Sequence, residues 1–211
     1  IVNGGPTTWV KVPGEPRNNY LARMDWAANT TDLTIEQLNR RQTVNTIYVA
    51  NATTGAVRPL IVERDSAWID IYDDHADWGP GPSFHWLPDK SAFIYVTPRD
   101  GWRHAYVVSR DGKMSLVTKG NYDVMKVVYI DLANGWLYFN ASPDNATRMS
   151  LWRARLDGTG EPERLTPAGS RGVHDYEIGP NARFAIHGWS AWGKPPVVEI
   201  ARLPSHEVVR T

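Results

Sequence analysis

The segment with the clearest resemblance to a catalytic motif is Gly188–Gly193, which places Ser190 where a Gly-x-Ser-x-Gly turn would expose a nucleophile. That turn needs glycine two residues after the serine and a helix beyond it. This chain has Trp192 at that position, followed by Pro195-Pro196 and a strand-like run. We therefore predict that Ser190 is not a nucleophile.

A second segment, residues 73–77, brings together three carboxylates and an imidazole. Hard cations such as Ca²⁺ take oxygen ligands at alternating positions around a glycine turn, and that spacing is absent here. We predict a solvated acidic loop, and we expect no metal or other cofactor in this chain. The rigid Gly- and Pro-rich stretch that follows begins with an aromatic side chain, Trp78.

Two further segments pair histidine with a charged residue. Arg103 and His104 follow Gly101-Trp102 in a predicted hairpin, where a general base could sit. We favour a structural role instead, in which the arginine locks the blade by a hydrogen bond to a backbone carbonyl or a carboxylate, because buried polar groups are normally paired. His174-Asp175 supplies two members of a serine-histidine-aspartate triad without a nucleophile, so we favour a packing role.

The composition narrows the classes of protein and of partner. The 211 residues carry 23 basic and 23 acidic side chains, which predicts no nucleic-acid partner and no contact with an anionic membrane. No apolar run is long enough for a transmembrane helix, and the absence of cysteine excludes disulfides. With 10 Trp, 9 Tyr, 17 Gly and 15 Pro, the chain is predicted to be all-β with many turns.

Strand-like runs separated by tight turns must position these side chains. Asp-Gly and Asn-Gly pairs at Asp111, Asn134 and Asp157 supply the positive φ angles of two-residue hairpins. The stretch 32–41 has some helical character, but it lies between strands and we predict a long strand. The clearest runs are residues 46–50, 92–96, 105–108 and 136–139, which are rich in β-branched and aromatic side chains.

A repeat of about 46 residues organises the strands. Aromatic residues precede turns at Asp89, Asn134 and Asn181, which are spaced 134 − 89 = 45 and 181 − 134 = 47. Short strands then close on Val117-Thr118 and Leu165-Thr166. This period fits four-stranded propeller blades better than a β-sandwich, because a sandwich does not require its turns to recur every 46 residues. We predict a partial β-propeller of about four blades, at residues 1–75, 76–122, 123–170 and 171–211.

Several of these segments together resemble the N-terminal β-propeller of dipeptidyl peptidase IV-type serine peptidases, of the prolyl oligopeptidase superfamily. The resemblance covers about residues 20–211 and implies the second half of an eight-bladed propeller. The segments that carry it are residues 21–26, 34–42, 101–104, 117–120, 122–124, 136–139 and 151–153.

In that family the propeller caps an α/β-hydrolase domain, so the resemblance implies a non-catalytic segment that gates and orients peptide substrates. The hydrolase domain, with its catalytic Ser, Asp and His, is expected beyond residue 211. The resemblance places Asp77 and Trp78 in a loop at the cavity face, with Arg103 as a third substrate-cavity candidate. No Glu-Glu pair of the kind that holds a substrate amine occurs here.

The resemblance also sets expectations about partners and location. The partners are the hydrolase domain of the parent protein and a peptide substrate that loses an N-terminal dipeptide. The parent is expected in the periplasm or outside the cell, and the lack of cysteine favours a bacterial source. Exposed blade faces predict a homodimer. A free-standing propeller that binds a protein or a sugar stays open as an alternative.

Overall fold

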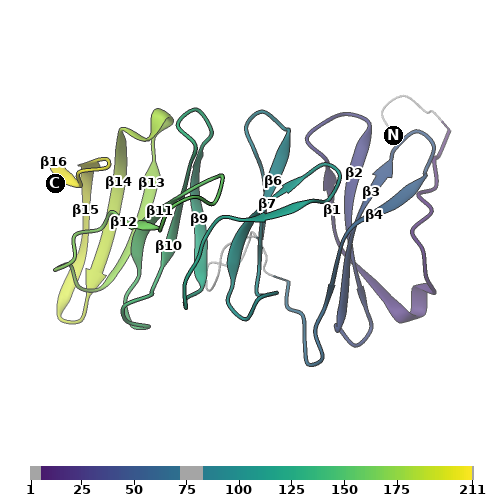
Figure 1. The fold of residues 1–211 in the computed structure, drawn as a ribbon, viewed down its shortest axis with the longest axis horizontal. Coiled ribbons are helices and arrows are strands. Elements are labelled where there is room, and N and C mark those ends of the chain that lie inside the picture. The colour runs from purple at the N-terminus through teal and green to yellow at the C-terminus, as the bar shows by residue number, and fades with distance from the viewer. Residues whose placement is uncertain (1–5, 72–82, 211) are drawn as a thin grey trace. The chain divides into compact units, whose positions relative to one another are not determined.

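The computed structural model describes residues 6–71 and 83–210, and within these ranges almost all regular structure is strand (Figure 1). Sixteen strands form four antiparallel sheets, each of four strands in sequential order. Two single-turn 3₁₀ helices, η1 (Pro16–Asn18) and η2 (Pro180–Ala182), complete the described elements. The predicted all-β fold of four-stranded propeller blades is confirmed. No helix in the described part of the chain is long and apolar enough to cross a membrane.

The sheets follow one another along the chain. The first contains β1 (Asn19–Trp26), β2 (Asp32–Asn39), β3 (Val44–Asn51) and β4 (Val57–Arg64). The second contains β5 (Phe84–Trp86), β6 (Ala92–Thr97), β7 (His104–Ser109) and β8 (Met114–Leu116). The third contains β9 (Val124–Asp131), β10 (Trp136–Ala141), β11 (Ser150–Arg155) and β12 (Glu163–Arg164). The fourth contains β13 (Val173–Ile178), β14 (Phe184–Ala191), β15 (Lys194–Arg202) and β16 (Glu207–Arg210).

The chain divides into two compact units. The first comprises residues up to Ile71 together with Arg110–Gly112, and it contains the first sheet. Its β2 strand occupies the stretch for which a strand was predicted over a helix. Ile35, Tyr48 and Ala50 form the buried apolar cluster of this sheet.

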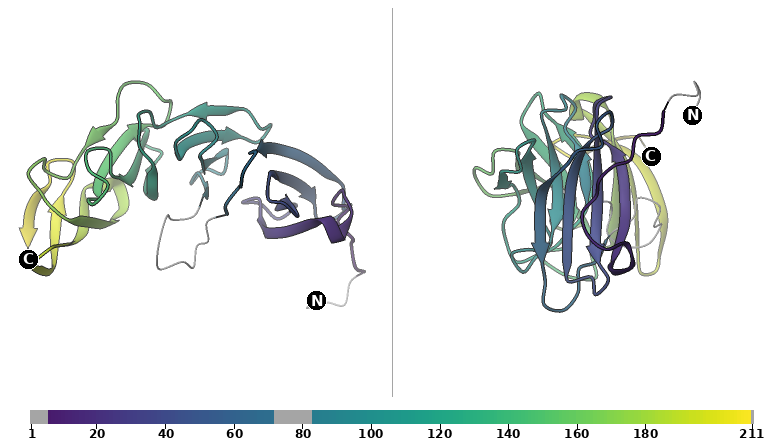
Figure 2. Two further views of the ribbon diagram at one scale, coloured as in Figure 1. Left: turned by 90° about the horizontal axis from the view of Figure 1, so that it is seen from below. Right: turned by 90° about the vertical axis from the view of Figure 1, so that its right-hand side faces the viewer.

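The second unit contains the other three sheets, which pack through two apolar clusters (Figure 2). Between the second and third sheets, Ile94, Leu137 and Phe139 are completely buried. The inner strands β6 and β10 are buried along almost their whole length, so residues 92–96 and 136–139 are consecutive apolar residues rather than alternating ones. Replacing Phe139 by alanine would cost about 3–5 kcal/mol, because it leaves a cavity in this core.

A buried threonine closes the second and third sheets, and it explains the repeated Val-Thr and Leu-Thr pairs. The Thr118 hydroxyl accepts a hydrogen bond from the backbone N–H of Ala105 at 3.0 Å. In the next sheet, the Thr166 hydroxyl accepts from the N–H of Leu151 at 2.8 Å. Each hydroxyl therefore satisfies a backbone donor that the departing outer strand can no longer reach. We call this feature the threonine joint.

One recurring glycine has a steric reason as well as a conformational one. Gly158 turns between β11 and β12 with φ +73°, in the left-handed region that favours glycine. A Cβ built there would lie 2.2 Å from the carbonyl oxygen of Leu116 in the preceding sheet. The turn of the third sheet thus approaches the second sheet more closely than any side chain would permit.

Candidate functional site

Of the three predicted substrate-cavity residues, Arg103 can be placed, whereas Asp77 and Trp78 lie outside the described residues. Arg103 precedes β7 and is 4% exposed. Its guanidinium Nη1 donates hydrogen bonds to the backbone carbonyls of Val124 and Met125 in β9. Its role in a substrate cavity stays a prediction, while the structure shows it joining the second sheet to the third.

The neighbouring His104 is also buried, and both of its ring nitrogens face oxygen acceptors. Nδ1 lies 2.8 Å from Oδ2 of Asp100, and Nε2 lies 2.9 Å from the carbonyl oxygen of Gly120. The Tyr106 hydroxyl donates to the same Asp100 oxygen at 2.9 Å. Burial raises the pKa of Asp100, but the hydrogen bonds from His104 and Tyr106 outweigh it and leave this pKa below its usual value.

A second group of buried polar side chains, which we call the histidine cluster, comprises His174, Tyr176, His187, Glu199 and His206. His174 Nδ1 lies 2.8 Å from His187 Nε2, and His187 Nδ1 lies 2.9 Å from Oε1 of Glu199. The Tyr176 hydroxyl lies 2.7 Å from Nε2 of His206 and 2.8 Å from the Thr166 hydroxyl. The cluster therefore connects β13, β14, β15 and the turn before β16 to the threonine joint of the third sheet.

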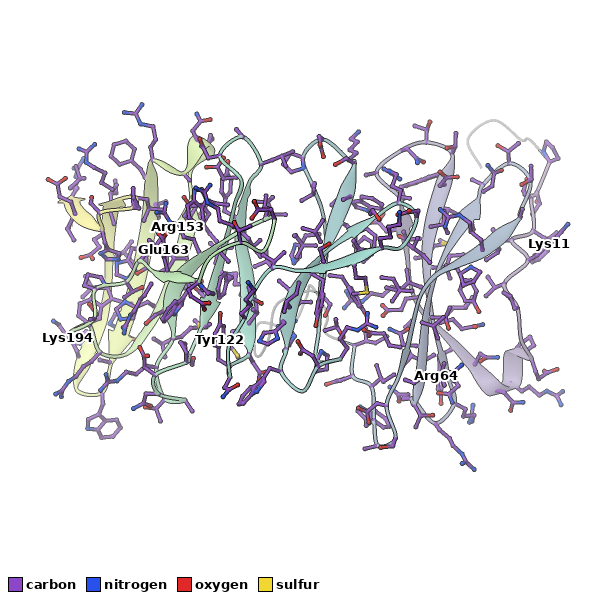
Figure 3. The ribbon with its side chains drawn as sticks, in the orientation of Figure 1. Lys11, Arg64, Tyr122, Arg153, Glu163 and Lys194 are labelled. Atoms are coloured by element: carbon purple, nitrogen blue, oxygen red, sulfur yellow. The ribbon has the colours of Figure 1, made fainter. Side chains whose placement is uncertain are left out.

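The rings of His174, Tyr176 and His187 are stacked, while His206 stands nearly perpendicular to Tyr176 and His187, at 79° and 78°. Tyr176 stacks on His187 with ring centroids 4.3 Å apart and an interplanar angle of 3°. Trp189 lies parallel to His174 at 5.7 Å, and the Lys194 ammonium lies 4.4 Å from the centre of the Trp189 ring. Figure 3 labels Lys194 in this last sheet. This packing fixes the orientation of the imidazoles.

Burial also decides the charge of the three imidazoles. Burial, and after it the neighbouring His187, lower the pKa of His174 to about 4. Burial likewise lowers the pKa values of His187 and His206, although the hydrogen bond to Glu199 partly opposes this for His187. The three rings are therefore neutral at neutral pH. Within the described ranges, no three His, Cys, Asp or Glu side chains are arranged to hold a metal ion.

The triad reading of His174-Asp175 fails on strand geometry. Successive strand residues face opposite sides of a sheet, so His174 is buried while Asp175 is exposed. Asp175 instead accepts hydrogen bonds from Lys126 Nζ at 3.2 Å and from Asn140 Nδ2 at 3.2 Å, both in the third sheet. The favoured packing role is what the structure shows.

Ser190 lies in a β-hairpin rather than in a strand-to-helix turn. It belongs to β14, which ends at Ala191, and β15 begins at Lys194. No helix follows in the described part of the chain, so the geometry that exposes a nucleophilic serine is absent.

The sequence did not reveal His187, Glu199 and His206 as parts of one cluster. They come from different strands and turns, and only the pairing register brings them together. Tyr176 is opposite His187, and His187 is opposite Glu199. A correct prediction of the pairing register of β13, β14 and β15 would have revealed the cluster, because directly opposed residues lie on the same face of a sheet.

The fold and these contacts can be compared with known proteins. Residues 1–196 match the family described as the dipeptidyl peptidase IV (DPP IV) N-terminal region. The chain belongs to the DPP IV N-terminal region family. The recognition of this propeller from short sequence segments is thereby confirmed.

Individual members of the family show how far the likeness extends. The chain is 22% identical over 175 residues to a "Probable dipeptidyl-aminopeptidase B" of Coccidioides posadasii, covering 76% of this chain and 18% of that protein. It is 24% identical over 152 residues to the "Inactive dipeptidyl peptidase 10" of Rattus norvegicus, covering 67% of this chain and 18% of that protein. This chain therefore matches less than a fifth of the length of either relative.

A solved member of the DPP IV type shares the fold. The crystal structure of Porphyromonas gingivalis dipeptidyl peptidase 4 superposes with a TM-score of 0.79, covering 96% of this chain and 27% of that chain. Sequence identity over the match is 22%, so the likeness establishes the arrangement of strands and no further property.

Proposed function

We propose that this chain is a non-catalytic propeller segment of a serine dipeptidyl peptidase. In this role it limits access to the active site and orients peptides whose N-terminal dipeptide is removed. The observation that carries the proposal is the family match over residues 1–196, supported by four blade-like sheets. In this mechanism a separate hydrolase domain supplies the serine nucleophile, the histidine base and the oxyanion hole.

The contribution of this segment would be positional. A loop that orients a peptide must be held by a rigid support, because a displacement of about 1 Å can cost roughly 100-fold in rate. Arg103 gives such support by tying the start of β7 to the carbonyls of Val124 and Met125. In this proposal the predicted substrate contacts Asp77 and Trp78 act as specificity residues.

The proposal is tested in the full-length protein with a dipeptidyl-p-nitroanilide substrate. Trp78→Ala is expected to raise KM about 5- to 20-fold with little change in kcat, since it removes a contact made before the chemical step. Trp192→Ala, in the exposed hairpin between β14 and β15, is the matched control and should leave both constants unchanged. Unchanged kinetics in Trp78→Ala, or equal effects of both variants, would overturn the substrate-orienting role.

Export of the parent protein is part of the same proposal, because the family's activity acts on extracellular peptides. Cell fractionation followed by immunodetection should place the full-length protein in the periplasm, on the cell surface or in the medium. Recovery with the cytoplasmic fraction alone would contradict it.

A binding function without catalysis is the second candidate, and the rat relative favours it, since that protein is described as inactive. The assay above separates the two candidates. Hydrolysis by the full-length protein that an active-site serine reagent abolishes selects the peptidase. A complete absence of hydrolysis selects the binding protein.

A further inference from the structure

The last sheet and the connection that leads into it line a half-open cavity that neither the peptidase proposal nor the family match accounts for. Its volume is about 210 Å³, which corresponds to about seven water molecules at liquid density. The cavity lies between the β12–β13 connection and one face of the last sheet, beside an outer strand β12 that is only two residues long. Its walls are Pro167, Ser170, Arg171, His174, His187, Trp189, Glu199, His206 and Val208.

Glu199 is the single acidic residue among these walls. Its Oε1 atom is held by His187 Nδ1 at 2.9 Å, and its side chain is only 12% exposed. Glu199 makes no second side-chain hydrogen bond among the described residues, which leaves acceptor capacity on the carboxylate for a ligand. A carboxylate that is this enclosed and held from one side is a preorganised acceptor.

The charge of the cavity favours a cation. The lowered pKa values leave His174, His187 and His206 neutral, so the formal charge in its interior is the negative charge of Glu199. An anion would meet this carboxylate directly. The positively charged Arg171 in the wall is exposed, so solvent weakens its repulsion of a cation without removing it.

We propose that this cavity binds the ammonium group of a primary alkylamine, with the Glu199 carboxylate accepting its hydrogen bond. A charge-assisted N–H···O bond in a partly enclosed site is among the stronger hydrogen bonds available to a protein. The volume accommodates an ammonium group with a chain of about four or five carbon atoms. The same chemistry is offered by a free small amine and by a lysine side chain of a peptide.

The site differs from a metal centre. His174 and His187 spend a nitrogen each on the bond between them, and His206 Nε2 is bonded to Tyr176. These bonds leave the imidazoles oriented toward one another rather than toward a common point. That arrangement agrees with the absence of a metal-holding group among the described residues.

The test is a titration of the 211-residue chain at pH 7.5 with n-butylammonium and, separately, with Nα-acetyl-lysine amide. Binding is followed by isothermal calorimetry and by the indole N–H resonance of Trp189. The expected dissociation constant is on the order of 1 mM, as befits a ligand of few atoms. Binding of butylammonium alone identifies a free amine as the ligand, whereas binding of the lysine amide identifies a peptide side chain.

Three variants and a matched control decide the role of Glu199. Glu199→Gln should weaken binding at least tenfold, while Glu207→Gln, an exposed glutamate paired with Arg202 on the same sheet, should have no effect. Arg171→Glu should tighten binding severalfold, because it replaces a repelling charge in the wall. Val208→Trp should abolish binding by filling the cavity, and Val208 is exposed enough for the substitution to leave folding intact.

The last two variants keep the test decisive even where Glu199→Gln does not fold. Absence of saturable binding by both probes overturns the proposal. So does equal affinity in Glu199→Gln, unchanged affinity in both Arg171→Glu and Val208→Trp, or tighter binding of inorganic phosphate or Zn²⁺ at the same resonances.

Discussion

Two regions of the second unit bury histidine next to carboxylate, yet they give its ring nitrogens different partners. His104 lies between the carboxylate of Asp100 and the carbonyl of Gly120, both of which accept hydrogen bonds. His174 and His187 instead bond to each other, and one carboxylate serves the pair. The first arrangement gives each ring nitrogen an oxygen acceptor, and the second needs one of the two facing ring nitrogens to be unprotonated so that it can accept. In the histidine cluster burial is the largest cause of the lowered pKa values, and the neighbouring groups modify its effect.

The same contrast applies to the surrounding charges. Arg103, beside His104, carries a full positive charge, and its guanidinium donates hydrogen bonds to backbone carbonyl oxygens of the next sheet. The histidine cluster offers Glu199 as its one carboxylate for three imidazoles. We therefore expect the contacts of Arg103 to depend on the permanent charge of its guanidinium, and the histidine cluster to depend on pH.

The largest expected effect is that of Arg103→Met. This substitution leaves the carbonyls of Val124 and Met125 without their donor and removes a charged hydrogen-bond network from a buried position. The free energy of unfolding should fall by about 3–4 kcal/mol, measured by urea denaturation. Arg210→Met, at an exposed position, is the control and should change it by less than about 0.5 kcal/mol. A loss below 1 kcal/mol in Arg103→Met would show that the network is not essential.

Acid should weaken the histidine cluster next most strongly. The pKa of His174 is about 4 in the folded chain and about 6.5 when unfolded, so the unfolded chain binds more protons between these values. Its contribution to stability is complete above pH 6.5 and is lost as the pH falls toward 4, by up to about 3 kcal/mol. The lowered pKa of Asp100 works in a different window, because its contribution is lost only as the pH falls below about 3.8.

Urea denaturation at pH 7.0 and 4.5 measures this difference, and His174→Gln should flatten the pH dependence. An equally steep pH dependence in His174→Gln would place the acid-sensitive group elsewhere.

A smaller effect distinguishes the two threonine joints. Thr118→Val removes the acceptor of one buried backbone N–H and should cost about 1–2 kcal/mol. Thr166→Val removes the same acceptor and also one of the two partners of the Tyr176 hydroxyl, which keeps His206, so it should cost about 1 kcal/mol more. Thermal unfolding of both variants measures the difference, and Thr→Ser at each position should restore most of the loss. Equal costs would mean that the Tyr176 contact contributes nothing.

The smallest effect is predicted for Ser190→Ala. The isolated chain should hydrolyse no dipeptidyl-p-nitroanilide before or after the change, and its stability should stay within about 0.5 kcal/mol. Hydrolysis that is lost in Ser190→Ala would show that the Gly188–Gly193 hairpin is catalytic after all.

The sequence predicted the fold better than it predicted the site. The turn residues Asp89, Asn134 and Asn181 are 45 and 47 residues apart. Each turn depends on the residues in it, so the repeat of the blades can be read from short stretches of sequence. The bond from Arg103 to a backbone carbonyl was foreseen, but its acceptors lie 21 and 22 residues away and no local pattern specifies them. The histidine cluster escaped notice because it depends on strand register, and a slip of one residue would turn His187 to the opposite face.

The threonine joint also bears on how such a chain could arise. Thr118 and Thr166 are 166 − 118 = 48 residues apart, and their donors Ala105 and Leu151 are 151 − 105 = 46 apart. Each joint is made between strands of one sheet, so a segment of about this length carries its own closure. Duplication of the corresponding stretch of gene would therefore add a unit whose last backbone donor is already satisfied. Genes built this way can lengthen or shorten by unequal recombination without leaving a strand end unpaired, and selection then acts on the surfaces that the copies no longer share.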